Sequence, residues 1–291
     1  MHRLLYWIEA ARLNTLTASF TPVLIGSSYA YYKNVFQLPV FFYCLAFALL
    51  CQIGSNFAND YLDNEKGADT ADRIGPERTV ASGKISLGAM RIATGFTLAL
   101  AFSIGLMLIP YGGYGLLLIG IACVFFAYAY TGGPYPLAYV GLGDVFVVLF
   151  FGFIAVTMSF YLHGLVLDGL IVLNALSCGL FINNLLVINN LRDCDVDRAC
   201  GKRTSIVRFG AMFGRNYIAL SCCLGSLTAI INALSIQSSI ALIALAPPLF
   251  TWWSLKNIHR LSNPLRFYSA LKKTSLSILL YGICVGLGFI I

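Results

Sequence analysis

Residues 38–63, LPVFFYCLAFALLCQIGSNFANDYLD, join a run of apolar side chains to a group of amides and carboxylates. The apolar part, residues 38–57, has about the 20-residue length that an α-helix needs to cross the hydrocarbon core of a bilayer. Asn56, Asp60 and Asp63 follow at helical spacing, so they project from one face if the helix continues. The stretch predicts a membrane-spanning helix with an oxygen-rich end.

Eight further apolar runs resemble the first part of this stretch. The chain has 291 residues, of which 59% are hydrophobic and 11% charged, against about 25% charged in an ordinary soluble domain. Too few polar groups remain to cover a water-facing surface, so we expect a lipid bilayer as the solvent. We predict a single all-α domain over residues 1–291, a polytopic bundle of about nine transmembrane helices around a central cavity. The predicted spans are residues 16–32, 38–57, 92–109, 114–130, 145–162, 170–188, 217–234, 240–255 and 276–291.

The basic residues predict the orientation of the bundle. If the N-terminus is cytoplasmic, Lys33 alone among the 19 lysines and arginines falls on the outer side. Such a bias is what the positive-inside rule requires of the segments that flank membrane helices. We therefore expect a multi-pass protein of the cell (inner) membrane, with its active site at the cytoplasmic face. The net charge of +7 reflects this topology, and we expect no nucleic acid partner.

A second oxygen-rich cluster continues the sixth apolar run. It reads NNLRDCDVD over residues 189–197, and its Asn189, Asp193 and Asp197 again have helical spacing. Each cluster is followed by the same pattern, Asp-Arg, four residues, then Arg-Thr, at residues 72–79 and at residues 197–204. The second and sixth runs cross in the same direction, so this internal repeat, near residues 56–79 and 189–204, is parallel. It predicts that both clusters lie on one membrane face.

The two clusters have the composition of a magnesium–diphosphate site. Carboxylates stacked along a helix repel one another, and Mg²⁺ prefers oxygen ligands and is commonly held by a few carboxylates together with substrate phosphates. Basic side chains nearby can pair with phosphate oxygens. The predicted metal ligands are Asn56, Asp60, Asp63, Asp193 and Asp197, and the four aspartates among them are the predicted catalytic residues. The predicted diphosphate-binding residues are Asn56, Arg73, Arg78, Asn189, Lys202 and Arg203.

A diphosphate site at a membrane surface favours a substrate with a polar head and a long apolar tail. Metal ions and arginines would stabilise the charge that develops as the allylic C–O bond breaks. Aromatic side chains could shield the resulting carbocation until an electron-rich ring attacks it. The chain holds 21 Phe and 16 Tyr, but the sequence does not single out those that line the cavity.

Five segments resemble the UbiA superfamily of intramembrane prenyltransferases, and the resemblance extends over nearly the whole chain. They begin at Asn56 (NFANDYLD), Asp72 (DRIGPER), Tyr130 (YTGGPYPL), Gly143 (GDVFV) and Asn189 (NNLRDCDVDR, followed by GKRT). Within that superfamily they resemble the 1,4-dihydroxy-2-naphthoate polyprenyltransferase branch of menaquinone biosynthesis.

The resemblance implies a Mg²⁺-dependent transfer of a polyprenyl group from polyprenyl diphosphate to 1,4-dihydroxy-2-naphthoate. The carboxyl group of the naphthoate is lost as CO₂, and the product is demethylmenaquinol. Residues 12–17 and 157–161 depart from the pattern of this branch, so another acceptor, 4-hydroxybenzoate or homogentisate, stays open. A membrane transporter is the remote alternative, which the parallel repeat disfavours because many transporters carry inverted repeats.

Overall fold

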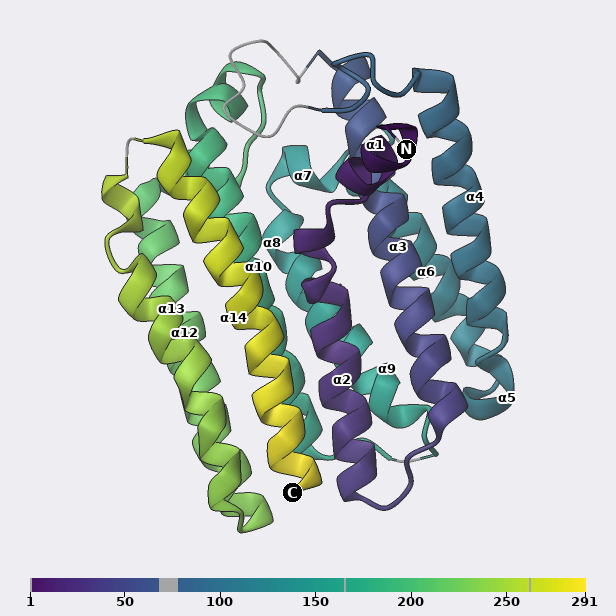
Figure 1. Ribbon diagram of the computed structural model, residues 1–291, viewed down its shortest axis with the longest axis vertical. Coiled ribbons are helices and arrows are strands. Elements are labelled where there is room, and N and C mark those ends of the chain that lie inside the picture. The colour runs from purple at the N-terminus through teal and green to yellow at the C-terminus, as the bar shows by residue number, and fades with distance from the viewer. Residues whose placement is uncertain (1, 68–77, 165, 262) are drawn as a thin grey trace.

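The computed structural model describes residues 2–67, 78–164, 166–261 and 263–291, and over these residues the fold is a bundle of helices without strands (Figure 1). Among the η elements, η2 is a π-helix and the other three are 3₁₀ helices. The elements in chain order are α1 (His2–Ala11), η1 (Leu13–Thr15), α2 (Thr17–Tyr32), α3 (Leu38–Glu65), α4 (Leu87–Leu106), α5 (Ile109–Gly112), α6 (Gly115–Ala129), α7 (Leu137–Val140), α8 (Gly143–Val147), η2 (Val148–Ile154), α9 (Ala155–Tyr161), α10 (Gly169–Ala199), α11 (Ser205–Phe209), α12 (Ala211–Ile236), η3 (Ser239–Leu245), α13 (Ala246–Leu255), η4 (Ile258–Arg260) and α14 (Pro264–Ile290).

Helices cover every apolar run, which confirms the all-α prediction. Within the described residues, six helical segments are long and apolar enough to cross a membrane, so this is a multi-span membrane protein. Three further predicted spans fall on shorter elements: α2 with 16 residues, α6 with 15, and η3 followed by α13. The total of nine spans stays a prediction.

The eighth predicted span owes its irregularity to two consecutive prolines. The chain forms the 3₁₀ helix η3 up to Leu245, and α13 begins at Ala246. Pro247 and Pro248 therefore lie in the first turn of α13, where a missing N–H costs nothing because that group has no partner within a helix.

The helices α3 and α10 continue well past their apolar parts, as the sequence predicted. They contain 28 and 31 residues and run parallel, ending at the upper end of the bundle in Figure 1. At the opposite end, Asp168 starts α10 by accepting hydrogen bonds of 3.0 Å from the N–H groups of Leu170 and Ile171. Lys33 lies 3.4 Å from the same carboxylate, so the two charges predicted on the outer face pair with each other.

Close backbone contact fixes η2 against α10. A Cβ atom added to Gly152 would lie 2.6 Å from the carbonyl oxygen of Ala175 and 2.8 Å from the Cα atom of Gly179. Small residues allow such an approach between membrane helices, and a π-helix commonly marks a functional segment within a helix. This contact positions the face of α8 and η2 that carries Phe146 and Phe150 relative to the oxygen-rich end of α10.

Candidate active site

The two oxygen-rich clusters meet at a single cation. The Nζ atom of Lys202, just after α10, lies 3.8 Å from a carboxylate oxygen of Asp63 on α3 and 3.8 Å from one of Asp197 on α10. The side chains of Asp63 and Asp197 are only 5% and 10% exposed. The parallel repeat therefore brings one aspartate from each copy into one buried site, where the charge of a lysine balances them.

Tyr139 on α7 connects this site to a second lysine. Its hydroxyl donates a 2.9 Å hydrogen bond to Asp63, and its ring lies between the Nζ atoms of Lys66 at 4.6 Å and Lys202 at 4.5 Å. Partial burial lowers the pKa of Lys66, Asp63 raises it, and Lys202 lowers it further. Sequence reasoning missed Tyr139, which lies two residues after the end of the segment 130–137.

Asp60 has a different environment from Asp63. It is 2% exposed, and its carboxylate accepts hydrogen bonds from the Thr79 hydroxyl at 3.2 Å, the Thr79 N–H at 3.3 Å and the Val80 N–H at 3.0 Å. Thr79 is the last residue of the first repeated pattern. Asp60 thus holds Thr79 and Val80 against α3.

Asp193 is held by its own neighbour in the sequence. The guanidinium group of Arg192 donates two hydrogen bonds of 2.7 Å to the two carboxylate oxygens of Asp193. Arg192 is 8% exposed, and its guanidinium lies 5.8 Å from the ring centre of Tyr268 on α14. Asp195 is exposed and pairs with Arg198 at 3.4 Å.

The predicted asparagine of the first cluster is joined by a neighbour that sequence reasoning missed. Asn56 donates hydrogen bonds to the Ala11 carbonyl at 2.8 Å and to the Thr15 hydroxyl at 3.0 Å. Asn59, one turn later, accepts hydrogen bonds of 2.8 Å from both Arg12 and Arg78. Asn59 therefore gathers two guanidinium groups beside the carboxylates.

The remaining predicted residues have mixed outcomes. Arg78 lies 3.8 Å from Asp63 as well as contacting Asn59. The side chain of Arg203 is exposed, and only its backbone N–H is engaged, with the Tyr139 carbonyl. Arg73 lies outside the described residues.

A polar chamber of about 620 Å³ lies between the two clusters. Its walls include Asp60, Asp63, Asp193 and Asp197 together with Arg78 and Lys202. Further charged or polar residues in its wall were not singled out by the sequence: Arg12, Asn59, Asp144, Asn190, Arg192, Tyr268 and Lys272. No simple periodicity could have found this set, because it comes from four helices, α3, α8, α10 and α14, and from the turn between α1 and η1.

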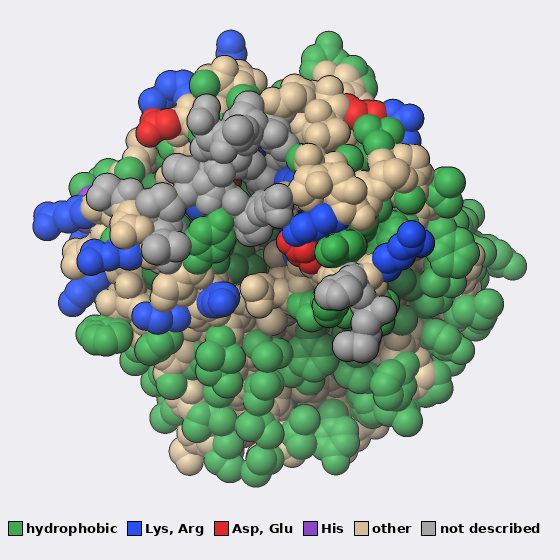
Figure 2. Space-filling view, turned by 45° about the horizontal axis from the view of Figure 1, so that its top comes forward, with side chains coloured by type: hydrophobic (Ala, Val, Ile, Leu, Met, Phe, Trp, Pro, Cys, Tyr) green, Lys and Arg blue, Asp and Glu red, His purple; other side chains and the backbone are tan. Residues whose placement is uncertain are grey.

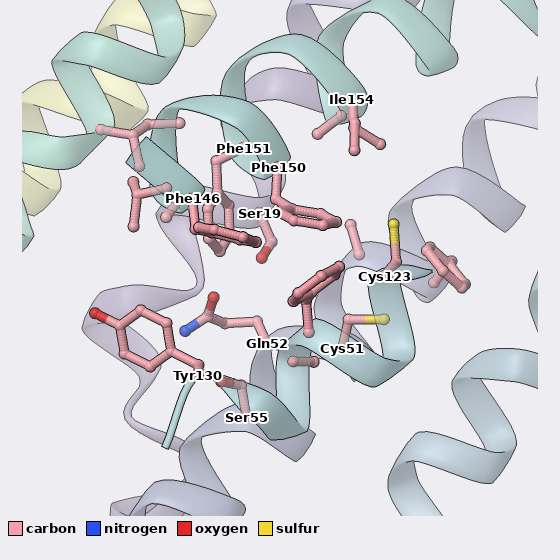
Figure 3. A pocket seen from close by; sticks show the side chains of 18 of the residues that line it. Ser19, Cys51, Gln52, Ser55, Cys123, Tyr130, Phe146, Phe150, Phe151 and Ile154 are labelled. Atoms are coloured by element: carbon pink, nitrogen blue, oxygen red, sulfur yellow. The ribbon is translucent and has the colours of Figure 1, made fainter. Parts of the chain in front are cut away.

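An apolar chamber of about 310 Å³ continues from the polar one into the bundle (Figure 3). Seven residues line both chambers: Arg12, Thr15, Asn59, Tyr130, Leu185, Leu186 and Asn189. In Figure 3, Tyr130 and Gln52 lie on one side of the cavity and Phe146, Phe150 and Ile154 on the other. The pair of chambers suits a molecule with an anionic head and an apolar tail, and it corresponds to the predicted central cavity.

Three phenylalanine rings form one wall of the apolar chamber. The ring centres of Phe126 and Phe146 are 4.9 Å apart, those of Phe126 and Phe150 are 5.3 Å apart, and those of Phe146 and Phe150 are 5.8 Å apart. Aromatic faces carry partial negative charge and attract cations within about 6 Å. The structure thus identifies which of the many aromatic residues face the cavity.

The donor groups around the polar chamber fit Mg²⁺. They are carboxylate and amide oxygens, the ligands this ion prefers, and the Lys202 ammonium group shows that a cation is accommodated between Asp63 and Asp197. Within the described residues, no three His, Cys, Asp or Glu side chains are close enough to form a ready metal cage. A dedicated protein cage is not expected for Mg²⁺, because the ion usually keeps waters and shares substrate phosphates.

Comparisons of the sequence with known proteins identify a family and named relatives. Residues 19–276 match the family model described as the UbiA prenyltransferase family. The chain is 37% identical to the 1,4-dihydroxy-2-naphthoate octaprenyltransferase of Escherichia coli (strain K12), over 97% of this chain and 94% of the relative. It is 36% identical to the enzyme of the same name from Haemophilus influenzae (strain ATCC 51907 / DSM 11121 / KW20 / Rd), over 99% and 97% of the two chains.

Solved structures share the fold at lower sequence identity. A UbiA homolog from Archaeoglobus fulgidus bound to GPP and Mg²⁺ aligns with a TM-score of 0.68 and 15% identity, covering 96% of this chain and 99% of that one. The apo structure of a UbiA homolog from Aeropyrum pernix K1 aligns with a TM-score of 0.69 and 16% identity, covering 96% and 98%. At such identities the likeness concerns the fold alone.

Proposed function

The chain belongs to the UbiA prenyltransferase family, and on this premise we propose how it acts. It transfers a polyprenyl group from polyprenyl diphosphate to 1,4-dihydroxy-2-naphthoate, with loss of CO₂, and so makes demethylmenaquinol for menaquinone biosynthesis. Asp60, Asp63, Asp193 and Asp197 serve a Mg²⁺-dependent diphosphate site between α3 and α10. The observation that carries this proposal is the meeting of Asp63 and Asp197 at the mouth of an apolar chamber.

The residues around the polar chamber divide into two groups with different tasks. Asn56, Asp60, Asp63, Asp193 and Asp197 supply oxygen ligands, and bound Mg²⁺ would neutralise the diphosphate and so make it a better leaving group. Arg78 and Lys202 donate to phosphate oxygens, and Arg73 and Arg203 serve the same group. Lys202 is placed to change partners, from the two carboxylates to the diphosphate, when substrate enters.

The apolar chamber holds the prenyl chain and protects the reacting carbon. When the allylic C–O bond breaks, its electron pair leaves with the diphosphate and the prenyl carbon becomes cationic. The faces of Phe146 and Phe150 stabilise this cation and exclude water that would otherwise capture it. The naphthoate ring then forms the new C–C bond, and the electrons of its bond to the carboxyl carbon return to the ring as CO₂ leaves.

The orientation and the repeat belong to the same proposal. The polar chamber opens toward the cytoplasm of a cell (inner) membrane protein, where the Lys and Arg residues of Figure 2 surround it. Residues 1–291 act as one domain whose two parallel copies, near 56–79 and 189–204, each supply half of the diphosphate site. Polyprenyl diphosphate, the naphthoate and the lipid bilayer are its partners.

Purified protein in detergent tests the reaction directly. It is incubated with Mg²⁺, a polyprenyl diphosphate and, in turn, 1,4-dihydroxy-2-naphthoate, 4-hydroxybenzoate and homogentisate, and prenylated product and CO₂ are measured. We expect prenylated naphthoquinol and an equal amount of CO₂ with the naphthoate, and no product after chelation of the metal until Mg²⁺ is restored. Prenylation of another acid in place of the naphthoate would overturn the acceptor assignment, and full activity in excess chelator would overturn the metal assignment.

A further inference from the structure

Basic residues occur along the whole chain, whereas acidic residues are confined to its first two-thirds. Asp197 is the last carboxylate side chain in the sequence, so residues 198–291 contain no Asp or Glu. The same segment holds ten basic residues, namely Arg198, Lys202, Arg203, Arg208, Arg215, Lys256, Arg260, Arg266, Lys272 and Lys273. The positive-inside rule accounts for basic residues near span ends, but it does not require that acids be absent, since Asp and Glu contribute little to topology.

The N-terminal half also has basic residues near the ends of its spans, as the positive-inside rule requires, but several of them pair with carboxylates. Lys84 lies 3.2 Å from a carboxylate oxygen of Glu9, and Arg91 pairs with Glu65. These pairs are on the side of the bundle built by α1, α3 and α4. In Figure 2, Lys and Arg side chains gather along the left edge, the side of α12 and α13, and the acidic side chain visible on that side lies above most of them.

Two of the uncompensated cations, Arg215 and Lys256, meet where α12 begins and α13 ends, and a third, Arg260, follows four residues later in η4. Arg215 on α12 donates a 3.1 Å hydrogen bond from Nε to the carbonyl oxygen of Lys256, and its guanidinium group lies 5.4 Å from the ring centre of Trp252. Lys256 and Arg260 follow on the adjoining turn and are exposed. Within the described residues neither makes an ion pair, so this basic site presents charges that the protein itself leaves unneutralised.

An apolar surface begins directly beside the basic site. Trp253 is 67% exposed and Phe250 is 44% exposed, and their ring centres are 6.3 Å apart. Tryptophan at this depth is typical of the interface between headgroups and acyl chains. A ligand bound here would therefore meet cations at one end and a lipid-facing aromatic surface at the other.

We propose that Arg215, Lys256 and Arg260 form a binding site for the headgroup of an anionic phospholipid, whose acyl chains lie along Phe250 and Trp253. Basic sites between membrane helices on the cytoplasmic side are suited to such headgroups. The fixed position of the Arg215 guanidinium favours a phosphate diester, which a planar donor can bind through two oxygens. A soluble anion would gain nothing from the adjoining aromatic surface, so a lipid is the better match.

Lipid retention measured by native mass spectrometry tests this site. Protein is released from nanodiscs of phosphatidylcholine containing one-fifth phosphatidylglycerol, and bound lipids are counted at increasing salt concentration. We expect the wild type to keep phosphatidylglycerol in preference to phosphatidylcholine, with a preference that decreases as salt rises. Each cation near a membrane surface contributes about fivefold to such binding, so Lys256→Gln with Arg260→Gln should reduce the preference more than tenfold.

The control removes the same charge from the same membrane face. Lys84→Gln with Arg91→Gln takes away two cations that already have carboxylate partners, and we expect it to keep the lipid preference. Equal losses in the two variants would overturn the proposal, because they would indicate a general attraction to negative lipid. Retention of the preference by Lys256→Gln with Arg260→Gln would overturn it as well.

Two further measurements separate folding and other ligands from the result. Prenyl transfer in pure phosphatidylcholine nanodiscs should be equal in the wild type and in Lys256→Gln with Arg260→Gln, since neither residue lines the chambers. Added inorganic diphosphate at millimolar concentration should leave phosphatidylglycerol bound. Its displacement would show that the site takes a soluble phosphate and would refute the lipid assignment.

Discussion

The oxygen-rich ends of α3 and α10 are copies in sequence, yet their carboxylates have different partners. On α3, Asp60 is saturated by donors from Thr79 and Val80, whereas on α10 Asp193 is held by the adjacent Arg192. Asp63 and Asp197 share one partner, Lys202, and Asp63 has in addition the Tyr139 hydroxyl and Arg78 beside it. The repeat thus defines where the oxygens lie, and their neighbours decide which of them are free to change ligands when substrate binds.

Substitution of Asp63 or Asp197, the two carboxylates that share Lys202, should have the largest effect on turnover. Asp63→Asn and Asp197→Asn each remove one carboxylate from the shared site, and we expect each to lower turnover by about 10³-fold, because charge stabilisation at the reacting group is lost. Prenyl transfer by purified variants in detergent measures this. A difference of more than tenfold in turnover between the two variants would show that the two carboxylates do not contribute equally.

Substitution of Asp60 should lower both stability and turnover, whereas substitution of Asp193 should lower mainly turnover. Asp60→Asn leaves three buried donors facing a weaker acceptor, so we expect a loss of about 2 kcal/mol in the free energy of unfolding together with a loss of turnover. Asp193 is more exposed than Asp60, with 17% of its side chain accessible, and Asp193→Asn keeps an amide oxygen that can accept from Arg192, so turnover should decrease with a smaller change in thermal stability. Thermal unfolding of the two variants in the same detergent makes the comparison, and equal shifts in Tm would contradict it.

Substitution of Asn56 should lower mainly stability and substitution of Asn189 mainly substrate binding, both with smaller effects than the aspartates. Asn56 is engaged with the Ala11 carbonyl and Thr15, so Asn56→Ala should cost about 1 kcal/mol of stability. Asn189 lines both chambers and makes no side-chain hydrogen bond to another described residue. Asn189→Ala should therefore raise the KM for polyprenyl diphosphate, by about tenfold for one lost hydrogen bond to a charged group, while Tm is unchanged.

Thr79→Val should have the smallest effect. It removes one of three donors to Asp60 while both backbone N–H groups remain, so we expect about 1 kcal/mol of destabilisation and turnover within about threefold of wild type. Thr204 on the second copy accepts a hydrogen bond from the Val207 N–H and so caps α11, and within the described residues its hydroxyl makes no hydrogen bond to an aspartate. Thr204→Val is the matched control, and it should affect stability without altering the metal dependence of turnover.

The sequence by itself determined the all-helical membrane class and the identity of the two clusters. Apolar runs of spanning length can bury their backbone polar groups only as helices, and carboxylates at helical spacing must share a face wherever the helix extends. These are local consequences of periodicity and solvent, so Asp63 and Asp197 could be selected without knowledge of the fold.

Only the tertiary structure decided which residues surround those carboxylates. Asn59 on α3, Tyr139 on α7, and Tyr268 and Lys272 on α14 come from three helices, and their approach to the clusters depends on packing such as the Gly152–Gly179 contact. The same holds for Phe146 and Phe150, since nothing in a phenylalanine-rich sequence says which rings face a cavity and which face lipid. Contacts between distant segments arise from how helices pack against one another, and the periodicity within one helix does not determine which other helices pack against it.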